Sequence, residues 1–573
     1  MEKKYKWKNL RKLPPMHRLF DRWVPESLTM IGALKFLQFL RLLGVRATNN
    51  GWRKVTSIFL RGESSKFTLG SFRLLPDAQA VMLPPGKGIA FTRLAAKLAA
   101  HLRSSNAIEY WVEPGKLAFV RRRYRHRDLM LAEVDKLGMI IKITPFFDRS
   151  HRSLEQEASP LLNEALQIVV YCCNKLHAMP ETARAVELLK QLKNWARSKS
   201  RFNYFGRRRR MWMVQRILHS TVLFCDVLES SDEAELIRER FTMPDFRKFR
   251  NPGLGMLSVV ARFTRDFREV DLWCQFNHVA ADGMPMQEFL NKLKKEWGSA
   301  GEVRYPPVNS GNLLAGTQVR YAGEGHFRAL FFLDFQPLLI LRNYLNAHYR
   351  EAMNGSAMIA GLLMWGLTRH EAFANRKILL PVDGGEFTAE AHDGERRLEL
   401  LMIRPRQFAR HGNNPLEDYC AFQKELNLRF QQARSGGGAV SEFLELCSLL
   451  PPLFYHVAKR LWPRALDEVL GTAGLSILRD SEMFISPLTE FQRGGFIAVG
   501  NISMPTVDGG YAGAVSVAGS RDHIRQSLEA LRHLPEDLLR MLDENMIADA
   551  QAGMLTGKSN SESDVDSVLK PVR

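Results

Sequence analysis

Two neighbouring segments near the middle of the chain have the pattern of β-strands. Every second residue from 270 to 276 is apolar, as in a strand that buries one face, and residues 257–263 are rich in apolar and β-branched side chains. The charged residues 265–269 lie between the two segments and fit a turn. Residues 284–297 then carry apolar side chains at helical spacing, and Pro285 suits a first helical turn. The pattern predicts a β-hairpin followed by a helix.

The same alternation of strands and helices extends over most of the chain, which indicates an α/β protein. The segment Pro84-Pro85-Gly86-Lys87-Gly88 lacks the residues of a phosphate loop and is predicted to be a turn. Further strands are predicted at 221–227, 327–334, 376–383, 496–504 and 514–518. Further helices are predicted at 91–102, at 161–196 with a break at Pro180, from 337 to 345, at 356–370 and at 521–544.

Composition and charge narrow the class of partner. The 573 residues are 45 % hydrophobic and 25 % charged, which is typical of a globular protein with two to four domains or two large lobes. Lys and Arg number 81 against 61 Asp and Glu, which gives a net charge of +20. This excess favours an anionic partner: a CoA-type nucleotide, an acidic carrier protein, an anionic membrane surface or nucleic acid.

Two basic clusters, at 121–127 and 207–210, have aromatic residues nearby. Each is either a solvated surface or a docking site for phosphates or an acidic carrier. Neither is accompanied by a nucleic-acid-binding motif, so nucleic acid is the least favoured of these partners.

The cysteines and the first residues indicate a cytoplasmic location. Six scattered cysteines form no C-x-x-C pair and no zinc-like cluster, which favours a reducing compartment and no metal site. We expect no signal peptide, because the basic start runs into Pro14-Pro15 rather than an apolar core. Residues 28–45 predict an amphipathic helix that packs on the protein, with contact at the inner membrane surface as the alternative.

The candidate chemistry lies between the predicted strand 270–277 and the helix that follows it. This segment contains His278, which can exchange a proton at cellular pH because an unperturbed histidine has a pKa of about 6.5. Asp282 follows four residues later and can brace the loop, and Gly283 leaves room for a ligand to pass close to the backbone. The alternative for His278 is a histidine that caps the end of the strand.

This order of strand, His-x-x-x-Asp-Gly and helix resembles the chloramphenicol acetyltransferase-like superfamily, which includes condensation domains, alcohol acyltransferases and the plant BAHD enzymes. The resemblance implies two lobes, each a mixed sheet flanked by helices, with the active site in a tunnel between them. Residues 1–150 would form a basic N-terminal region packed on the first lobe, 151–310 the first lobe, 311–556 the second and 557–573 a disordered tail. The order of elements also indicates an internal repeat. The BAHD motif Asp-Phe-Gly-Trp-Gly is absent, which indicates a divergent branch.

The resemblance implies acyl transfer from acyl-CoA or an acyl carrier protein to a hydroxyl or amine, with no bound cofactor. His278 would be the general base, and Asp282 would turn away to an arginine that the sequence does not identify. His523 has no aspartate four residues later, so it is predicted to lie at the start of a helix. A hydroxyl of the second lobe would stabilise the oxyanion, and the candidates are Ser476, Ser486 and Thr489. The alternative for each is a hydroxyl that caps backbone.

Two other functions remain open from the sequence. One is a condensation-type enzyme that forms amide bonds between carrier-bound substrates. The other is a non-catalytic binding protein that keeps the fold.

Overall fold

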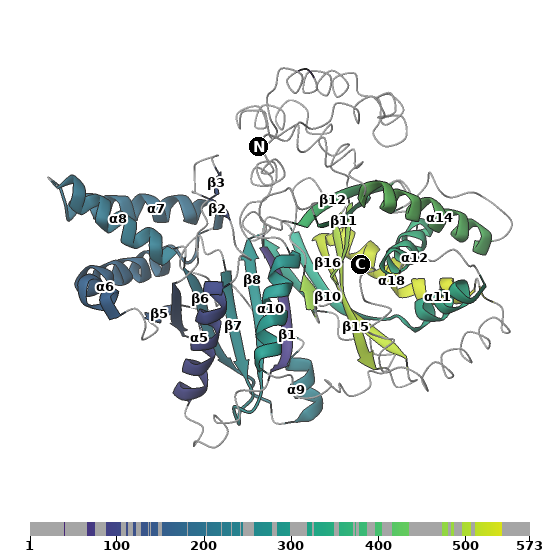
Figure 1. Cartoon of the computed structure of the whole chain (residues 1–573). Helices are drawn as coiled ribbons and strands as arrows, with labels where there is room; N and C mark the ends of the chain where they lie inside the picture. The colour runs from purple at the N-terminus through teal and green to yellow at the C-terminus, as the bar shows by residue number, and fades with distance from the viewer. Residues whose placement is uncertain are drawn as a thin grey trace.

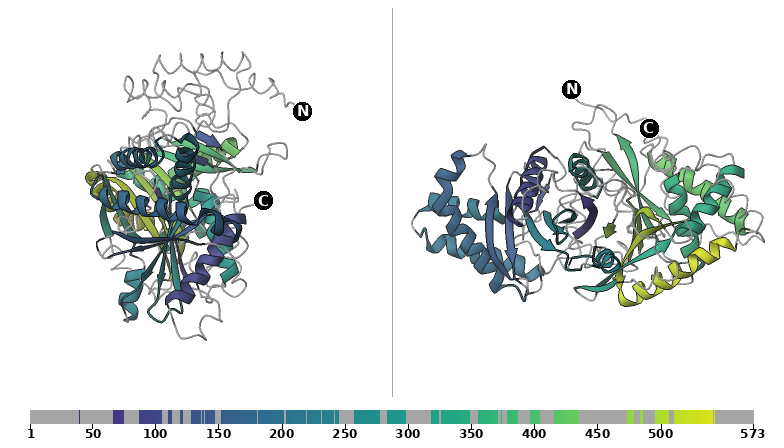
Figure 2. Two further views of the ribbon diagram at one scale, coloured as in Figure 1. Left: turned by 90° about the vertical axis from the view of Figure 1, so that its left-hand side faces the viewer. Right: turned by 90° about the horizontal axis from the view of Figure 1, so that it is seen from below.

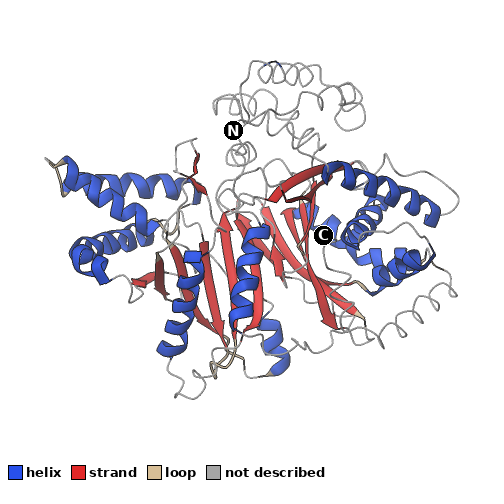
Figure 3. Cartoon of the chain, viewed as in Figure 1, coloured by secondary structure: helices blue, strands red, loops and turns tan. Residues whose placement is uncertain are grey.

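Two β-sheets lie next to one another in a computed structural model of the chain, and helices surround them (Figures 1 and 3). The structure describes residues 39, 66–74, 87–104, 110–112, 119–121, 128–135, 137, 139–146, 152–179, 181–201, 203–218, 220–230, 232–240, 242–244, 257–277, 283–297, 318–323, 326–348, 355–370, 373, 378–386, 396–403, 415–434, 473–478, 483–485, 495–505, 510–540 and 542.

The strands and helices alternate through the described residues. The strands are β1 (Lys66–Leu74), β2 (Tyr110–Val112), β3 (Phe119–Arg121), β4 (Leu129–Val134), β5 (Ile140–Phe146), β6 (Thr221–Val227), β7 (Leu257–Phe263), β8 (Val270–Asn277), β9 (Gln318–Gly323), β10 (His326–Asp334), β11 (Ile378–Glu386), β12 (Arg396–Ile403), β13 (Ala473–Ile477), β14 (Met483–Ile485), β15 (Phe496–Pro505) and β16 (Tyr511–Ser520). The helices are α5 (Lys87–Ser104), α6 (Arg152–Lys175), α7 (Glu181–Ser198), α8 (Tyr204–Leu218), α9 (Glu233–Arg240), α10 (Gly283–Trp297), α11 (Gln336–His348), α12 (Gly355–Arg369), α14 (Pro415–Arg434) and α18 (Arg521–Leu539).

The two large sheets have the same pairing pattern. The first runs β14-β1-β8-β7-β6-β4-β5, and the second, read from its other edge, runs β9-β10-β16-β15-β13-β11-β12. In each, the fourth, fifth and sixth strands in this order pair in parallel, and the other neighbours pair antiparallel. The prediction of two lobes built on mixed sheets is therefore confirmed, and the shared order supports the internal repeat.

Each sheet buries both faces, because its strands alternate between two apolar clusters. In the second sheet, Phe331 and Val499 lie in a core with residues of α11, α12, α14 and α18. The opposite face turns toward the first lobe, where Leu330 and Ala514 share a cluster with Trp273 of β8. The views in Figure 2 show the helices of the second lobe at one end of the molecule and α6 to α8 at the other.

One strand crosses between the halves of the sequence. β14 comes after β13, a strand of the second sheet, yet it pairs antiparallel with β1 at the edge of the first sheet. Its counterpart in the second sheet, β9, precedes its own partner β10 directly. The first sheet is therefore completed by a segment more than 400 residues away from β1 in the chain.

The strands before and after residue 150 belong to one sheet, since β1, β4 and β5 pair in the same sheet as β6, β7 and β8. The strands predicted at 221–227 and 257–263 are confirmed as β6 and β7, and the turn predicted at 265–269 lies between β7 and β8. The helical region predicted at 161–196 is confirmed as α6 and α7, which are interrupted before Glu181.

The turn predicted at 84–88 is wrong at its C-terminal end. Lys87 and Gly88 are the first residues of α5, because the apolar residues that follow pack as one helix against α10. Pro84 to Gly86 lie outside the described residues, as do the predicted helix at 28–45 apart from Phe39 and the basic cluster at 121–127 apart from Arg121.

Candidate functional site

The structure places some of the candidate residues and leaves others outside its described ranges. Gly283 is the first residue of α10, and Ser476 lies in β13. His278, Asp282, Ser486 and Thr489 lie outside the described residues, as does the tunnel that was expected beside them. The geometry of the site is therefore built from the elements that lead into and out of these segments.

β8 and α10 bracket the segment 278–282. β8 lies between β7 and β1, with Phe276 opposite both Leu257 and Phe67. Phe276 is fully buried, and so is Met286 in the first turns of α10. Both belong to one apolar cluster, so the strand and the helix on either side of His278 in the chain pack into the same core. The predicted strand at 270–277 and the helix after it are confirmed.

Ser476 of the second lobe lies on the sheet face that turns toward this core. Its neighbour Leu475 belongs to the core of the second lobe, so Ser476 points to the opposite face, because side chains alternate along a strand. Its pairing partner across the sheet is Ala498, which is fully buried in the same apolar cluster as Phe276 and Met286. Ser476 itself is half-buried.

A second hydroxyl lies on the same row of this face. Ser516 of β16 also pairs with Ala498, and it is 1 % exposed. No sequence motif points to this residue. The sequence predicts a strand at 514–518, but only the register of β15 with β13 and β16 places Ser516 in line with Ser476.

The C-terminal ends of β8 and β14 lie at the same end of the first sheet. Thr68 of β1 pairs with Gln275 on one side and with Ile485 on the other. Both outer strands are antiparallel to β1, so they run in the same direction and leave the sheet together, two strand spacings or about 10 Å apart. The chain segments that contain His278 and Ser486 therefore begin at the same end of the sheet.

The charged network on β8 lies at the other end of that strand. Arg240 Nε lies 2.9 Å from Asp271 Oδ2, and its Nη2 donates to Glu269 Oε2 at 2.6 Å. Arg240 and Asp271 are 3 % and 0 % exposed, so each charge is neutralised inside the protein. Asp271 is about 20 Å along the strand from Asn277, at about 3.3 Å per residue. This network braces the hairpin and does not contribute to the segment 278–282.

Cys274 is the nearest cysteine to His278 in the chain, and its environment makes it a poor nucleophile. Burial raises the pKa of its thiol to about 12, because the apolar core disfavours the thiolate. Its side chain belongs to the same apolar cluster as Phe276. A covalent intermediate on this cysteine is therefore not favoured at neutral pH.

His523 lies at the start of α18, as its sequence context predicts. It is buried, and its Nε2 lies 3.1 Å from the hydroxyl of Ser527 one turn later. β16 has the same place in the second sheet as β8 has in the first, so the connection from β16 to α18 corresponds to the connection from β8 to α10. Near this connection in the second lobe, the imidazole of His523 packs against the ring of Phe373, which lies edge-on to it at 5.7 Å between centroids.

Within the described ranges, no group of three or more His, Cys, Asp or Glu side chains is arranged to hold a metal ion. Among those same residues, no helix is both long and apolar enough to cross a bilayer.

Comparison with known proteins gives structural matches only. The sequence matches no family model and no curated protein. The chain is similar to the condensation domain of the Monacolin K polyketide synthase MokA, with 12 % identity, a TM-score of 0.40 and coverage of 86 % of this chain and 96 % of that chain. It is also similar to the trichothecene 15-O-acetyltransferase from Fusarium sporotrichioides, with 8 % identity, a TM-score of 0.42 and coverage of 85 % and 94 %.

A third solved structure, the wax ester synthase/diacylglycerol acyltransferase from Marinobacter aquaeolei VT8, matches with 11 % identity, a TM-score of 0.35 and coverage of 86 % and 98 %. The first of these three solved structures is a condensation domain, and the other two are acyltransferases. The two-lobed class is defined by the sheet order of this chain.

Proposed function

We propose that the protein is an acyltransferase that moves an acyl group from a thioester donor, acyl-CoA or an acyl carrier protein, to a hydroxyl or amine acceptor. One observation carries the proposal. The strand and helix that bracket His278 share a buried core with Ala498, the strand partner of Ser476 in the other lobe. The two lobes thus meet at the strand and the helix that precede and follow the candidate base in the sequence.

The chemistry needs few groups. His278 removes the proton from the acceptor as its oxygen or nitrogen bonds to the thioester carbonyl carbon, and it then delivers that proton to the departing thiolate as the C–S bond breaks. General acid–base assistance of this kind contributes about 10²–10⁴-fold. The Ser476 hydroxyl is the described candidate to stabilise the intermediate oxyanion, and Asp282 would brace the loop. A net charge of +20 supports an anionic donor of either kind.

The proposal places the reaction in the cytoplasm, which the scattered cysteines support, and it requires no bound cofactor. Its first test is release of free thiol from a series of acyl-CoA donors, with panels of alcohols and amines as acceptors. His278→Ala should lower turnover by at least about 100-fold. The matched control is His533→Ala, which removes an exposed histidine of α18. Equal turnover in wild type and His278→Ala would eliminate His278 as the base.

Ser476→Ala should lower kcat by about 10²–10³-fold with a smaller change in KM, because an oxyanion donor acts in the transition state. Ser516→Ala is the matched control, since it removes a hydroxyl from the same row of the same sheet face. Equal losses in both variants would assign the effect to packing. Amide formation only when donor and acceptor are both carrier-bound would favour the condensation-type alternative, and no turnover with any donor would favour a binding protein.

A further inference from the structure

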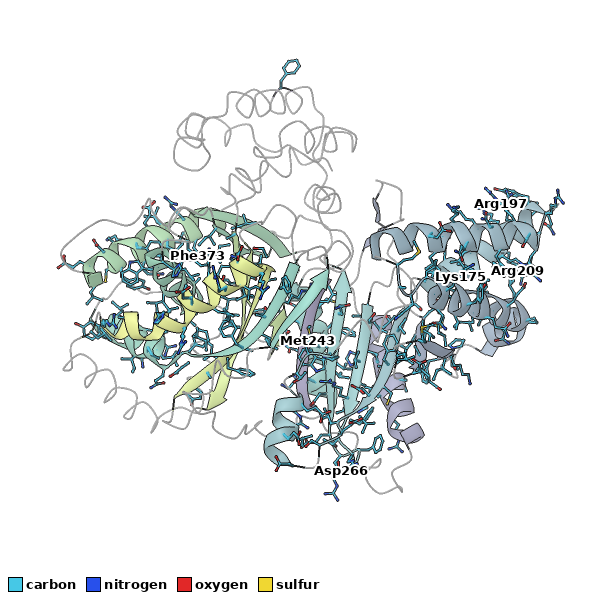
Figure 4. All side chains as sticks on the ribbon, turned by 180° about the vertical axis from the view of Figure 1, so that it is seen from behind. Lys175, Arg197, Arg209, Met243, Asp266 and Phe373 are labelled. Carbon is cyan, nitrogen blue, oxygen red and sulfur yellow. The ribbon has the colours of Figure 1, made fainter. Side chains whose placement is uncertain are left out.

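α8 exposes a face made of aromatic and arginine side chains. The helix buries Met213, Val214, Ile217 and Leu218 against the rest of the first lobe. On its opposite side it exposes five residues at helical spacing, Tyr204, Phe205, Arg208, Arg209 and Trp212, which we call the α8 outer face. Figure 4 shows Arg209 and Arg197 of α7 at the outer end of the helices α6 to α8, away from the sheets.

The chain segment that contains α8 carries charge of one sign. Ten of the 27 residues from Lys190 to Arg216 are Lys or Arg, and none is Asp or Glu. Some of the ten pair with acidic residues nearby: Arg216 forms a forked ion pair with Asp128, Arg210 lies 3.7 Å from Glu164, and Lys190 lies 3.4 Å from Glu187. Exposed basic side chains remain on the outside at Lys193, Arg197, Lys199, Arg208 and Arg209.

The aromatic side chains of the α8 outer face are exposed to an unusual degree. Phe205 is 78 % exposed, Tyr204 58 % and Trp212 53 %. Of the eight large hydrophobic residues that are exposed among the described residues, six lie on α6, α8 or the β4–β5 hairpin beside them. Exposed aromatic residues that are gathered in one region mark an interaction site more often than single ones do.

We propose that the α8 outer face binds the surface of an anionic lipid bilayer. Trp and Tyr rings favour the interface between lipid headgroups and water, and Phe buries its ring below it. Arginines at the same level contact lipid phosphates, and a basic segment without acidic residues is attracted to a negative leaflet. The helix lies at the end of the molecule, so a flat surface can reach it without obstruction by the sheets (Figures 1 and 2).

Arginine positions also support the lipid surface over a single soluble ligand. Arg207 stacks on the Tyr204 ring at 5.4 Å and Arg216 on the Trp212 ring at 5.6 Å, which fixes how these aromatics project. The stacked rings stand on the exposed side of a helix, which fits an extended surface. The inference does not depend on the acyl-transfer proposal, since it uses none of the candidate site residues.

The test is co-sedimentation of the full chain with vesicles of phosphatidylcholine and phosphatidylserine, compared with vesicles of phosphatidylcholine alone. Wild type should partition to the mixed vesicles and be released by high salt. The double variant R208E/R209E should bind at least about 20-fold more weakly, because each basic residue near an anionic surface contributes about fivefold. The control R525E/R532E makes the same charge change on exposed residues of α18 in the other lobe and should bind like wild type.

Two further measurements separate lipid contact from general attraction. F205A/W212A keeps every charge, and it should also lose binding. Brominated phosphatidylcholine in the mixed vesicles should quench part of the fluorescence in wild type, and less in Trp212→Phe. Circular dichroism would establish that each variant is folded.

Three results would overturn the proposal: equal losses in R208E/R209E and R525E/R532E, no difference in quenching between wild type and Trp212→Phe, or binding to single-stranded RNA in preference to mixed vesicles. The last result would assign the α8 outer face to nucleic acid, since aromatic and arginine side chains also stack on bases.

Discussion

Gly495 occupies a position at the start of β15 that the structure closes to any side chain. Its φ is +91°, which L-residues rarely adopt. A Cβ at this residue would lie 1.9 Å from Cδ2 of His523 and 2.6 Å from the backbone oxygen of Ala518. The carbonyl of Gly495 also accepts a hydrogen bond from the N–H of Gly474 at 3.0 Å, so it helps to hold β13, the strand of Ser476, beside β15.

We expect Gly495→Ala to destabilise the second lobe by about 2–6 kcal/mol. Backbone strain at a positive φ contributes about 1–3 kcal/mol. Forcing the imidazole of His523 and the strand of Ala518 apart adds about 1–3 kcal/mol, the usual range for overpacking a core. Because a domain is stable by about 5–15 kcal/mol in total, a loss of this size should be visible in urea unfolding followed by circular dichroism.

The double-mutant cycle with His523→Ala separates the two contributions. Removing the ring should relieve the side-chain clash, so the two changes should be non-additive by about 1–2 kcal/mol, while the backbone strain remains. The control is Gly206→Ala in α8, where no positive φ is present and the nearest atom to the new Cβ is the hydroxyl of Ser200 at 3.0 Å. A Gly495→Ala variant as stable as wild type, or a fully additive cycle, would refute this account.

Three other changes test the interior. The raised pKa of Cys274 predicts that a thiol reagent at pH 8 modifies the half-buried Cys225 before Cys274 in the native protein, and mass spectrometry of labelled peptides checks the order. The same shift predicts that stability falls above pH about 9, because the Cys274 thiol loses its proton in the unfolded state before it does so in the folded state. Arg240→Met leaves Asp271 buried without this cation and should cost about 3–5 kcal/mol, measured by urea midpoint. Tyr419→Phe removes a hydroxyl that donates to a buried amide oxygen at 2.9 Å, which should cost about 1–3 kcal/mol in the same assay.

The sequence alone determined most of the local structure. β6 and β7 begin and end where their apolar runs do, and β8 ends at Asn277 as its alternation predicts. Local prediction worked there because the pattern of apolar side chains specifies which face of a strand or helix is buried. The turn predicted at 84–88 was wrong at Lys87. Turn-forming residues can stand directly before a helix, and the apolar face of that helix then decides where it begins.

The choice of neighbours was decided only by the tertiary structure. The three residues of β14 carry no local signal that they complete a sheet begun at Lys66, and Ser476 gains its orientation toward the first lobe only through its register with Ala498. The physical reason is that strand pairing joins residues that are distant in the chain, and its energy depends on the partner strand and on the core beneath it. Sequence pattern thus determined which faces are buried, and the assembled sheets decided what each face meets.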